Sequence, residues 1–130
     1  TMYELSVRAD FAAAHRLCNH PAKCCHLHGH TWDVELTVAG RDLNKDGMLL
    51  DFGHLKALLR EIVDGLDHSY LNEHPAFGGD ASDDSPTAEN IARYIFTTVR
   101  EDLIQNHPGV LVKAVTVWES PKSSVRYSEA

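Results

Sequence analysis

The sequence predicts an α+β fold: a four-stranded antiparallel sheet with two helices on one face, in the order ββααββ. Residues 3–15 and 28–38 alternate between apolar and polar side chains, as strands with one buried face do. Residues 49–66 and 85–103 instead repeat their apolar side chains at three- and four-residue steps, as amphipathic helices do. Since neither a linker nor a repeat interrupts the 130 residues, we expect a single domain spanning residues 1–130.

The two N-terminal strands each carry histidine on their buried face. In residues 3–15 the apolar side chains occupy odd positions, and His15 continues that face because residues two apart in a strand point the same way. In residues 28–38, His28 and His30 share a face with Trp32 and the apolar residues that follow it. A hairpin between the two strands would bring these faces together.

The helices are bounded by capping residues. Asp51 is the expected N-cap of the first helix, and Gly65 lies near its end. The second helix is expected to begin at "SPTAEN", with Ser85 as the cap and Pro86 at the first helical position. Two further strands follow, at residues 110–119 and 123–128.

Composition narrows the class of function. The formal net charge of −7 argues against nucleic acid and anionic membrane surfaces as partners. No apolar run approaches the roughly 20 residues that span a bilayer, and the alternating, charged N-terminal stretch does not resemble a signal peptide. All three cysteines lie between positions 18 and 25, an odd number in one short segment. This pattern favours a reducing cytoplasm, where clustered Cys and His indicate a metal or catalysis.

The stretch "CCHLHGH" at positions 24–30 is the candidate metal site. His28 and His30 project from one strand face, and a hairpin would add His15 as a third imidazole. Three protein ligands with an open position describe catalytic zinc. Cys24 or Cys25 could instead complete a closed structural site, and an H-x-H pair also arises by chance in a histidine-rich surface loop.

Three more residues carry candidate chemistry. Asp67 and His68 could form a proton relay if they meet in space, although these residues taken alone favour a local cap or turn. Glu119 ends an apolar strand, where a carboxylate could accept paired N–H donors from a guanidine-like ligand edge or simply emerge into water. A thiol of the Cys24–Cys25 pair beside a cation could act as a base or nucleophile.

Six segments in this order resemble the 6-pyruvoyl-tetrahydropterin synthase/QueD family. They are "FAAAHRL", "CCHLHGHTWDVELTVAG", "GMLLDFGHLK", "LDHSYLN", "SPTAENIA" and "VTVWES", and they cover nearly the whole chain. Each segment is weakly diagnostic alone, but six in sequence are specific. The spacing C-x3-H-G-H is similar to that of the 6-carboxy-tetrahydropterin synthase branch, because the pyruvoyl branch usually has a longer interval.

The resemblance assigns roles to the candidates. The family's zinc ligands fall on His15, His28 and His30, and its catalytic cysteine falls on Cys24. The reaction implied converts 7,8-dihydroneopterin triphosphate and water to 6-carboxy-5,6,7,8-tetrahydropterin, acetaldehyde and triphosphate, for queuosine and deazapurine synthesis. In it, zinc is a Lewis acid at the substrate's side-chain hydroxyls, and the thiolate of Cys24 moves the proton of the adjacent C–H.

The same resemblance covers the remaining positions. The family's catalytic Asp–His pair falls on Asp67 and His68, its pterin-anchoring glutamate falls on Glu119, and Thr87 stands in the "PTxE" segment that helps to hold the pterin. The implied fold is the tunnelling fold, and the implied assembly is a homotrimer or homohexamer with active sites between subunits. Asp67 and His68 would then reach the zinc of a neighbouring chain.

Two other functions compete with this interpretation. One is another pterin lyase on the same scaffold, which makes 6-pyruvoyl-tetrahydropterin or cleaves dihydroneopterin. The other is a non-catalytic zinc-binding module whose cysteines close the coordination sphere.

Overall fold

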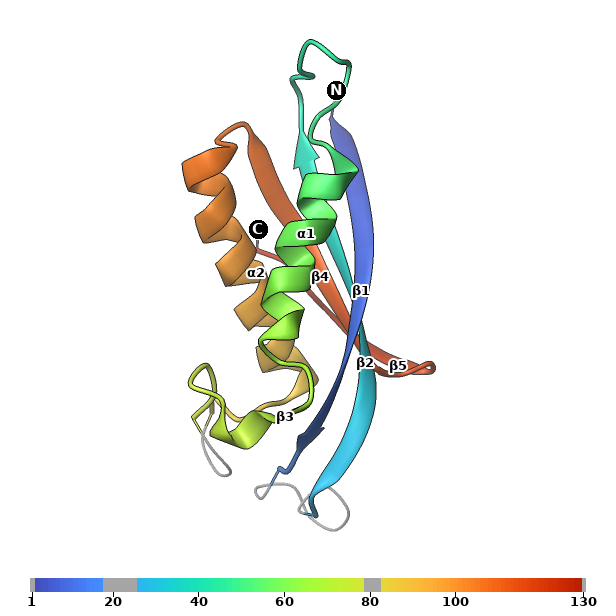
Figure 1. The fold of residues 1–130 in the computed structure, drawn as a ribbon, viewed down its shortest axis with the longest axis vertical. Coiled ribbons are helices and arrows are strands. Elements are labelled where there is room, and N and C mark those ends of the chain that lie inside the picture. The colour runs from blue at the N-terminus through green and yellow to red at the C-terminus, as the bar shows by residue number, and fades with distance from the viewer. Residues whose placement is uncertain (1, 18–25, 79–82, 130) are drawn as a thin grey trace.

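The computed structural model describes residues 2–17, 26–78 and 83–129. Its elements, in chain order, are β1 (Tyr3–His15), β2 (His28–Gly40), α1 (Phe52–Asp64), β3 (Ser69–Tyr70), the 3₁₀ turn η2 (Leu71–Glu73), α2 (Ala88–Asn106), β4 (Val110–Ser120) and β5 (Ser123–Tyr127). The strands form one sheet in the order β3-β1-β2-β4-β5. Both helices cover the same face of this sheet (Figure 1), so the predicted α+β layering is confirmed.

The sheet is built around the long hairpin of β1 and β2. The two strands pair antiparallel over their full length, from Tyr3 opposite Gly40 to His15 opposite His28, and no bulge interrupts the register. The odd residues of β1 therefore share a face with the even residues of β2. That face meets the helices, and its far end carries the histidines.

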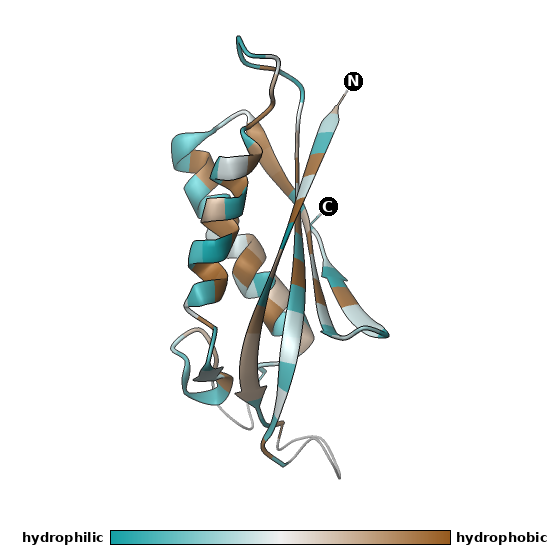
Figure 2. Ribbon diagram, turned by 45° about the vertical axis from the view of Figure 1, so that its right-hand side comes forward, coloured by the Kyte–Doolittle hydropathy of each residue, from teal (hydrophilic) through white to brown (hydrophobic). Residues whose placement is uncertain are grey.

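The hydrophobic core fills the space between this face and the helices. Trp32 is completely buried, its ring stacks on Phe11 at a centroid distance of 6.0 Å, and its indole N–H donates to the carbonyl of Ala13. The apolar stripes of the helices face the same layer, as the hydropathy colouring of Figure 2 shows. The buried helical residues are Leu55, Leu59, Ile62 and Val63 in α1, and Ala88, Ile91, Ala92, Ile95, Phe96, Val99 and Leu103 in α2.

The structure confirms the expected N-cap of the first helix and corrects the expected N-cap of the second. Asp51 caps α1, since its carboxylate accepts from the backbone N–H of Gly53 at 3.0 Å. The cap of α2 is Thr87 rather than Ser85, because the Thr87 hydroxyl accepts from the backbone N–H of Asn90 at 3.1 Å. Pro86 therefore precedes the helix instead of opening it.

The expected count of four antiparallel strands is also corrected. The sheet has five strands. The unexpected one, β3, has two residues and runs parallel to β1 beside Ala13 and Ala14. Two hydrogen bonds hold the chain there: the N–H of Ala12 donates to the Asp67 carboxylate at 2.8 Å, and the N–H of His68 donates to the Ala12 carbonyl at 2.6 Å. A two-residue strand is too short to show alternation, so its sequence carries no strand signal.

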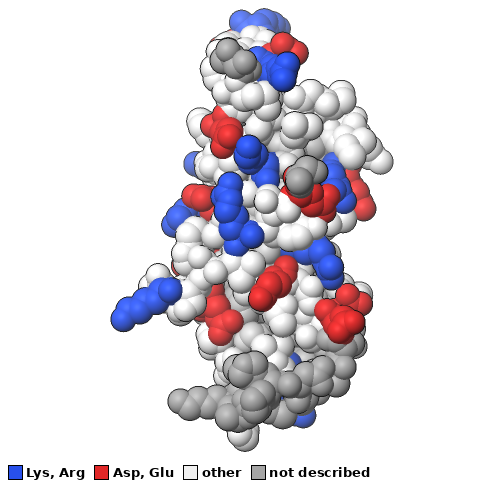
Figure 3. All heavy atoms as spheres, turned by 180° about the vertical axis from the view of Figure 1, so that it is seen from behind, with Lys and Arg blue, Asp and Glu red and all other residues white. Residues whose placement is uncertain are grey.

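The rear face of the molecule is charged but mixed in sign. Figure 3 shows Lys and Arg interspersed with Asp and Glu rather than gathered into a patch of one sign. Arg8 on β1 lies 3.2 Å from the carboxylate of Glu35 on β2 and covers the ring of Trp118 on β4. Within the described ranges, none of the helices has the length and apolar character needed to cross a bilayer.

Candidate metal centre

Three imidazoles converge at the end of the β1–β2 hairpin. Strand pairing places His15 opposite His28 and Ala13 opposite His30, so the three rings lie on one face. Their centroids are 4.5 Å apart for His15 and His28, 5.3 Å for His15 and His30, and 4.8 Å for His28 and His30. The expected approach of the three side chains is therefore observed.

Outer hydrogen bonds orient the imidazoles. His15 is fully buried, and its Nδ1–H donates to the carbonyl of Pro86 at 2.8 Å. His28 Nδ1–H donates to the carbonyl of His26 at 2.7 Å. Because a carbonyl can only accept, each contact leaves Nε2 as the nitrogen with a free lone pair.

Two of the nitrogens that face one another lack a hydrogen-bond partner among the described residues. Nε2 of His15 and Nε2 of His30 are buried and make no hydrogen bond to any described residue. An unpartnered buried nitrogen is costly, whereas a cation at the shared position would coordinate it. One ligand atom from each of His15, His28, His30 and Glu119 lies within 4.8 Å of the others, so this group can hold a metal ion.

Glu119 joins the imidazoles through the pairing of β4 with β2. Val117 of β4 lies opposite Val34 of β2, so Glu119, two residues further along β4, shares the face of the even residues of β2, which include His30. Its Oε1 lies 3.2 Å from His30 Nε2, without the alignment of a hydrogen bond. The sequence predicted a ligand-binding carboxylate at this strand end, but not its contact with the histidine group.

The electrostatics favour neutral imidazoles. Burial is the main cause that lowers the pKa of His15 below its ordinary value of 6.5, and the hydrogen bond to Pro86 opposes it. Burial likewise lowers the pKa of His30, and the Glu119 carboxylate opposes that shift. The lowered pKa values favour the neutral form of both rings, which is the protonation state that a metal ion requires of histidine.

Asp67 and His68 contact each other at the edge of the sheet. His68 Nδ1 lies 2.9 Å from the Asp67 carboxylate, so the two adjacent residues do meet. The Ala12 N–H, and after it His68, lowers the pKa of Asp67 below its ordinary value. The His68 side chain is 84% exposed, its backbone φ is 54°, and it does not belong to the histidine group of its own chain.

The remaining candidates are less defined. The Thr87 hydroxyl caps α2, so a pterin contact from Thr87 stays a prediction. Cys24, together with Cys18 and Cys25, lies outside the described residues. The Pro86 carbonyl, which orients His15, was missed because the sequence gives no signal for the direction of a backbone carbonyl.

The fold and the site together define an α+β protein with a histidine-rich group at the end of a long hairpin that can hold a metal ion. The model of the family "6-pyruvoyl tetrahydropterin synthase" matches residues 4–130, and the chain belongs to this family. The resemblance drawn from the sequence motifs is thereby confirmed.

Curated relatives share the match over most of their length. A 6-carboxy-5,6,7,8-tetrahydropterin synthase of Haemophilus influenzae is 31% identical, covering 98% of this chain and 100% of the relative. Proteins of the same name from Bacillus subtilis and Synechocystis are 35% and 38% identical, covering 96% and 91% of this chain and 84% and 87% of theirs.

Solved structures show the same fold. The 6-pyruvoyl tetrahydropterin synthase of Caenorhabditis elegans superimposes with a TM-score of 0.84 at 24% identity, over 100% of this chain and 97% of that one. The 6-pyruvoyl tetrahydropterin synthase of Plasmodium vivax gives a TM-score of 0.75 at 22% identity, over 99% and 98% of the two chains. At this identity the similarity concerns the fold alone.

Removal of one imidazole from the group tests its capacity for metal. We expect His28→Ala to weaken Zn²⁺ binding by more than about 100-fold. This loss is larger than the one usually seen when a ligand keeps its place but loses its hydrogen-bond partner. The control is His54→Ala, which removes an exposed imidazole in the first turn of α1. Competition with a chromophoric chelator measures both; wild-type affinity in His28→Ala would refute the assignment of the site.

Proposed function

We propose that the protein is a zinc-dependent 6-carboxy-5,6,7,8-tetrahydropterin synthase of the cytoplasm. It converts 7,8-dihydroneopterin triphosphate and water to 6-carboxytetrahydropterin, acetaldehyde and triphosphate, a carbon–carbon lyase reaction that supplies queuosine and deazapurine synthesis. The observation that carries the proposal is the inward-facing group of three imidazoles in a chain of this family. The names of the bacterial relatives support the carboxy product over the pyruvoyl product.

Zinc suits the donor set. Imidazole nitrogen is a preferred zinc ligand, and three protein ligands leave a position for substrate. His15, His28 and His30 would hold the ion, and its contribution when bound is Lewis acidity toward the hydroxyls of the substrate's side chain. The Nε2 atom of His15 supports this assignment, because the Nδ1–H contact with Pro86 leaves it a lone pair that makes no hydrogen bond to a described residue.

Glu119 orients the substrate in this proposal. A pterin presents an amidine-like N–H edge, and a carboxylate can accept two parallel hydrogen bonds from it. Since the Glu119 carboxylate lies 3.2 Å from His30 Nε2, a pterin bound there would have its side chain beside the metal position. This proximity supports one continuous site for ring and side chain.

Proton transfers belong to Cys24 and the Asp67–His68 pair. The thiolate of Cys24 takes the proton from the activated C–H of the substrate, and His68 donates or accepts a second proton. The 2.9 Å contact supports the pair, because Asp67 fixes the ring orientation and the tautomer of His68. A positioned acid or base of this kind contributes about 10²–10⁴-fold to the rate.

The proposed assembly is a homotrimer or homohexamer with sites between subunits. Two features support it. In the described part of the chain, β5 lies at one border of the sheet and the two-residue β3 covers Ala13 and Ala14 of β1 at the other, so both borders offer backbone groups for pairing with other copies. His68 is exposed beside that second border, where a neighbouring chain's metal group could reach it.

The product identifies the reaction. We expect the zinc-loaded protein, incubated with 7,8-dihydroneopterin triphosphate, to release acetaldehyde and form 6-carboxytetrahydropterin in equal amounts. Chromatography with mass spectrometry measures the pterin, and a coupled alcohol dehydrogenase assay measures the aldehyde. A 6-pyruvoyl product would place the protein in the pyruvoyl branch of the family. Failure to convert any dihydropterin would favour the non-catalytic zinc-binding module.

Cysteine variants test the proton transfer. We expect Cys24→Ala to lower kcat by about 10²–10⁴-fold with an unchanged zinc content, because the base is lost and the three imidazoles remain. Cys18→Ala is the matched control and should keep the wild-type rate. A Cys24→Ala protein with normal turnover, beside a Cys25→Ala protein without it, would move the role to Cys25.

A further inference from the structure

The carbonyl of Pro86 accepts a hydrogen bond from His15, the buried candidate metal ligand. His15 is completely buried, and Nδ1 reaches this carbonyl at 2.8 Å across 71 residues of sequence. Because the carbonyl accepts, it selects the Nδ1–H tautomer and leaves the Nε2 lone pair directed at the other imidazoles. The direction of one backbone carbonyl thus determines how His15 presents itself to a cation.

A tight turn fixes the direction of that carbonyl. The N–H of Thr87 donates to the carbonyl of Ser85 at 2.8 Å, which closes a three-residue turn centred on Pro86. The proline ring holds φ near −65°, and the Thr87 carbonyl accepts the N–H of Ile91 as α2 begins. The direction in which the Pro86 carbonyl points therefore depends on how the turn is held at the start of α2.

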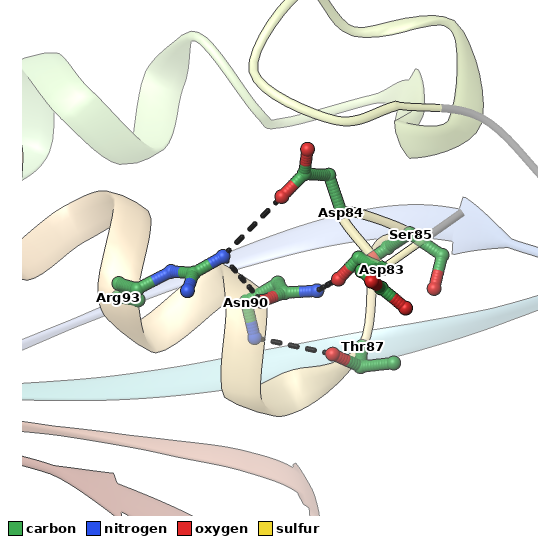
Figure 4. A network of polar contacts seen from close by, with 6 residues as sticks. All are labelled: Asp83, Asp84, Ser85, Thr87, Asn90 and Arg93. Carbon is green, nitrogen blue, oxygen red and sulfur yellow. Dashed lines mark hydrogen bonds and ion pairs between the residues drawn. The ribbon is translucent and has the colours of Figure 1, made fainter.

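Asn90 holds the turn against the helix. Its side-chain Nδ2 donates to the carbonyls of Asp83 and Ser85 at 2.8 and 2.9 Å, and its backbone N–H donates to the Thr87 hydroxyl. Figure 4 shows the Asn90 side chain reaching from the first turn of α2 to the residues before Pro86. Asn90 thus bonds the carbonyls on the N-terminal side of Pro86 through its side-chain amide, and the cap on the C-terminal side through its backbone N–H.

Arg93 fixes the orientation of this amide. Its guanidinium donates to Asn90 Oδ1 at 2.9 Å and lies 3.4 Å from the Asp84 carboxylate. A guanidinium can only donate and the two carbonyls can only accept, so Oδ1 must face Arg93 and Nδ2 must face the turn. The amide satisfies all of these partners in one orientation.

We propose that Asn90 is a positioning residue of the metal centre, which acts through the turn at Pro86 on the tautomer and position of His15. This inference rests on the proposed binding of zinc by His15, His28 and His30. Asn90 contacts neither the imidazoles nor a substrate in this scheme. Its effect is on the affinity for the metal, and outer partners of ligating histidines typically change that affinity 10–100-fold.

Two measurements on Asn90→Ala test the proposal. We expect the dissociation constant for Zn²⁺, from chelator competition, to rise roughly tenfold. In metal-free protein labelled with ¹⁵N-histidine, we expect the His15 ring to change from the Nδ1–H form to a mixture of tautomers. The His15 signals are assigned by their loss in His15→Ala. A residue that only stabilised α2 would leave the tautomer unchanged.

Asn106→Ala is the matched control, because Asn106 ends the same helix and its amide donates an exposed hydrogen bond to the Asp102 carboxylate, far from the turn at Pro86. Should Asn90→Ala fail to fold, Asn90→Asp keeps the shape and removes the two N–H donors. A zinc affinity within about twofold of wild type, or an unchanged His15 tautomer, would overturn the proposal. A wild-type chain that binds no zinc would instead refute the proposed function, while the tautomer still reports on Asn90.

Discussion

The unbroken register of β1 with β2 is the constraint on which the site depends. Because strand side chains alternate with a period of two, a slip of one residue would turn His28 and His30 to the opposite face of the sheet. The register is held by the buried face of the hairpin, where Trp32 packs on Phe11 and donates to the Ala13 carbonyl. The same packing that forms the core therefore places the imidazoles opposite one another.

This arrangement leaves two buried imidazole nitrogens without a hydrogen bond to a described residue at the edge of the core. Folding removes Nε2 of His15 and His30 from water without giving either a hydrogen bond to a described residue, which costs free energy. A bound cation would recover that free energy, so metal binding and folding stability are coupled at this end of the sheet. The lowered pKa values of the two rings point the same way, since a metal displaces no proton from a neutral imidazole.

Much of this arrangement follows from sequence patterns that depend on local chain geometry. Alternation predicts β1 with its observed bounds, and the H-x-H spacing alone puts His28 and His30 on one face of a strand. These sequence patterns do not predict features that depend on contacts between distant segments of the chain. β3 exists because the chain around Asp67 bonds to Ala12, and Glu119 reaches His30 because β4 pairs with β2 beside the histidines. The second helix begins at Ala88 because the hydroxyl of Thr87, rather than that of Ser85, accepts the N–H of Asn90.

The most direct test of the account is the coordination sphere of the zinc-loaded protein, measured by zinc K-edge X-ray absorption in the absence of substrate. Three imidazole nitrogens at about 2.0–2.1 Å, with a further oxygen or nitrogen donor and no sulfur, are the predicted result. A sphere closed by sulfur at about 2.3 Å, or one with fewer than three imidazoles, would contradict the claim that His15, His28 and His30 form an open site.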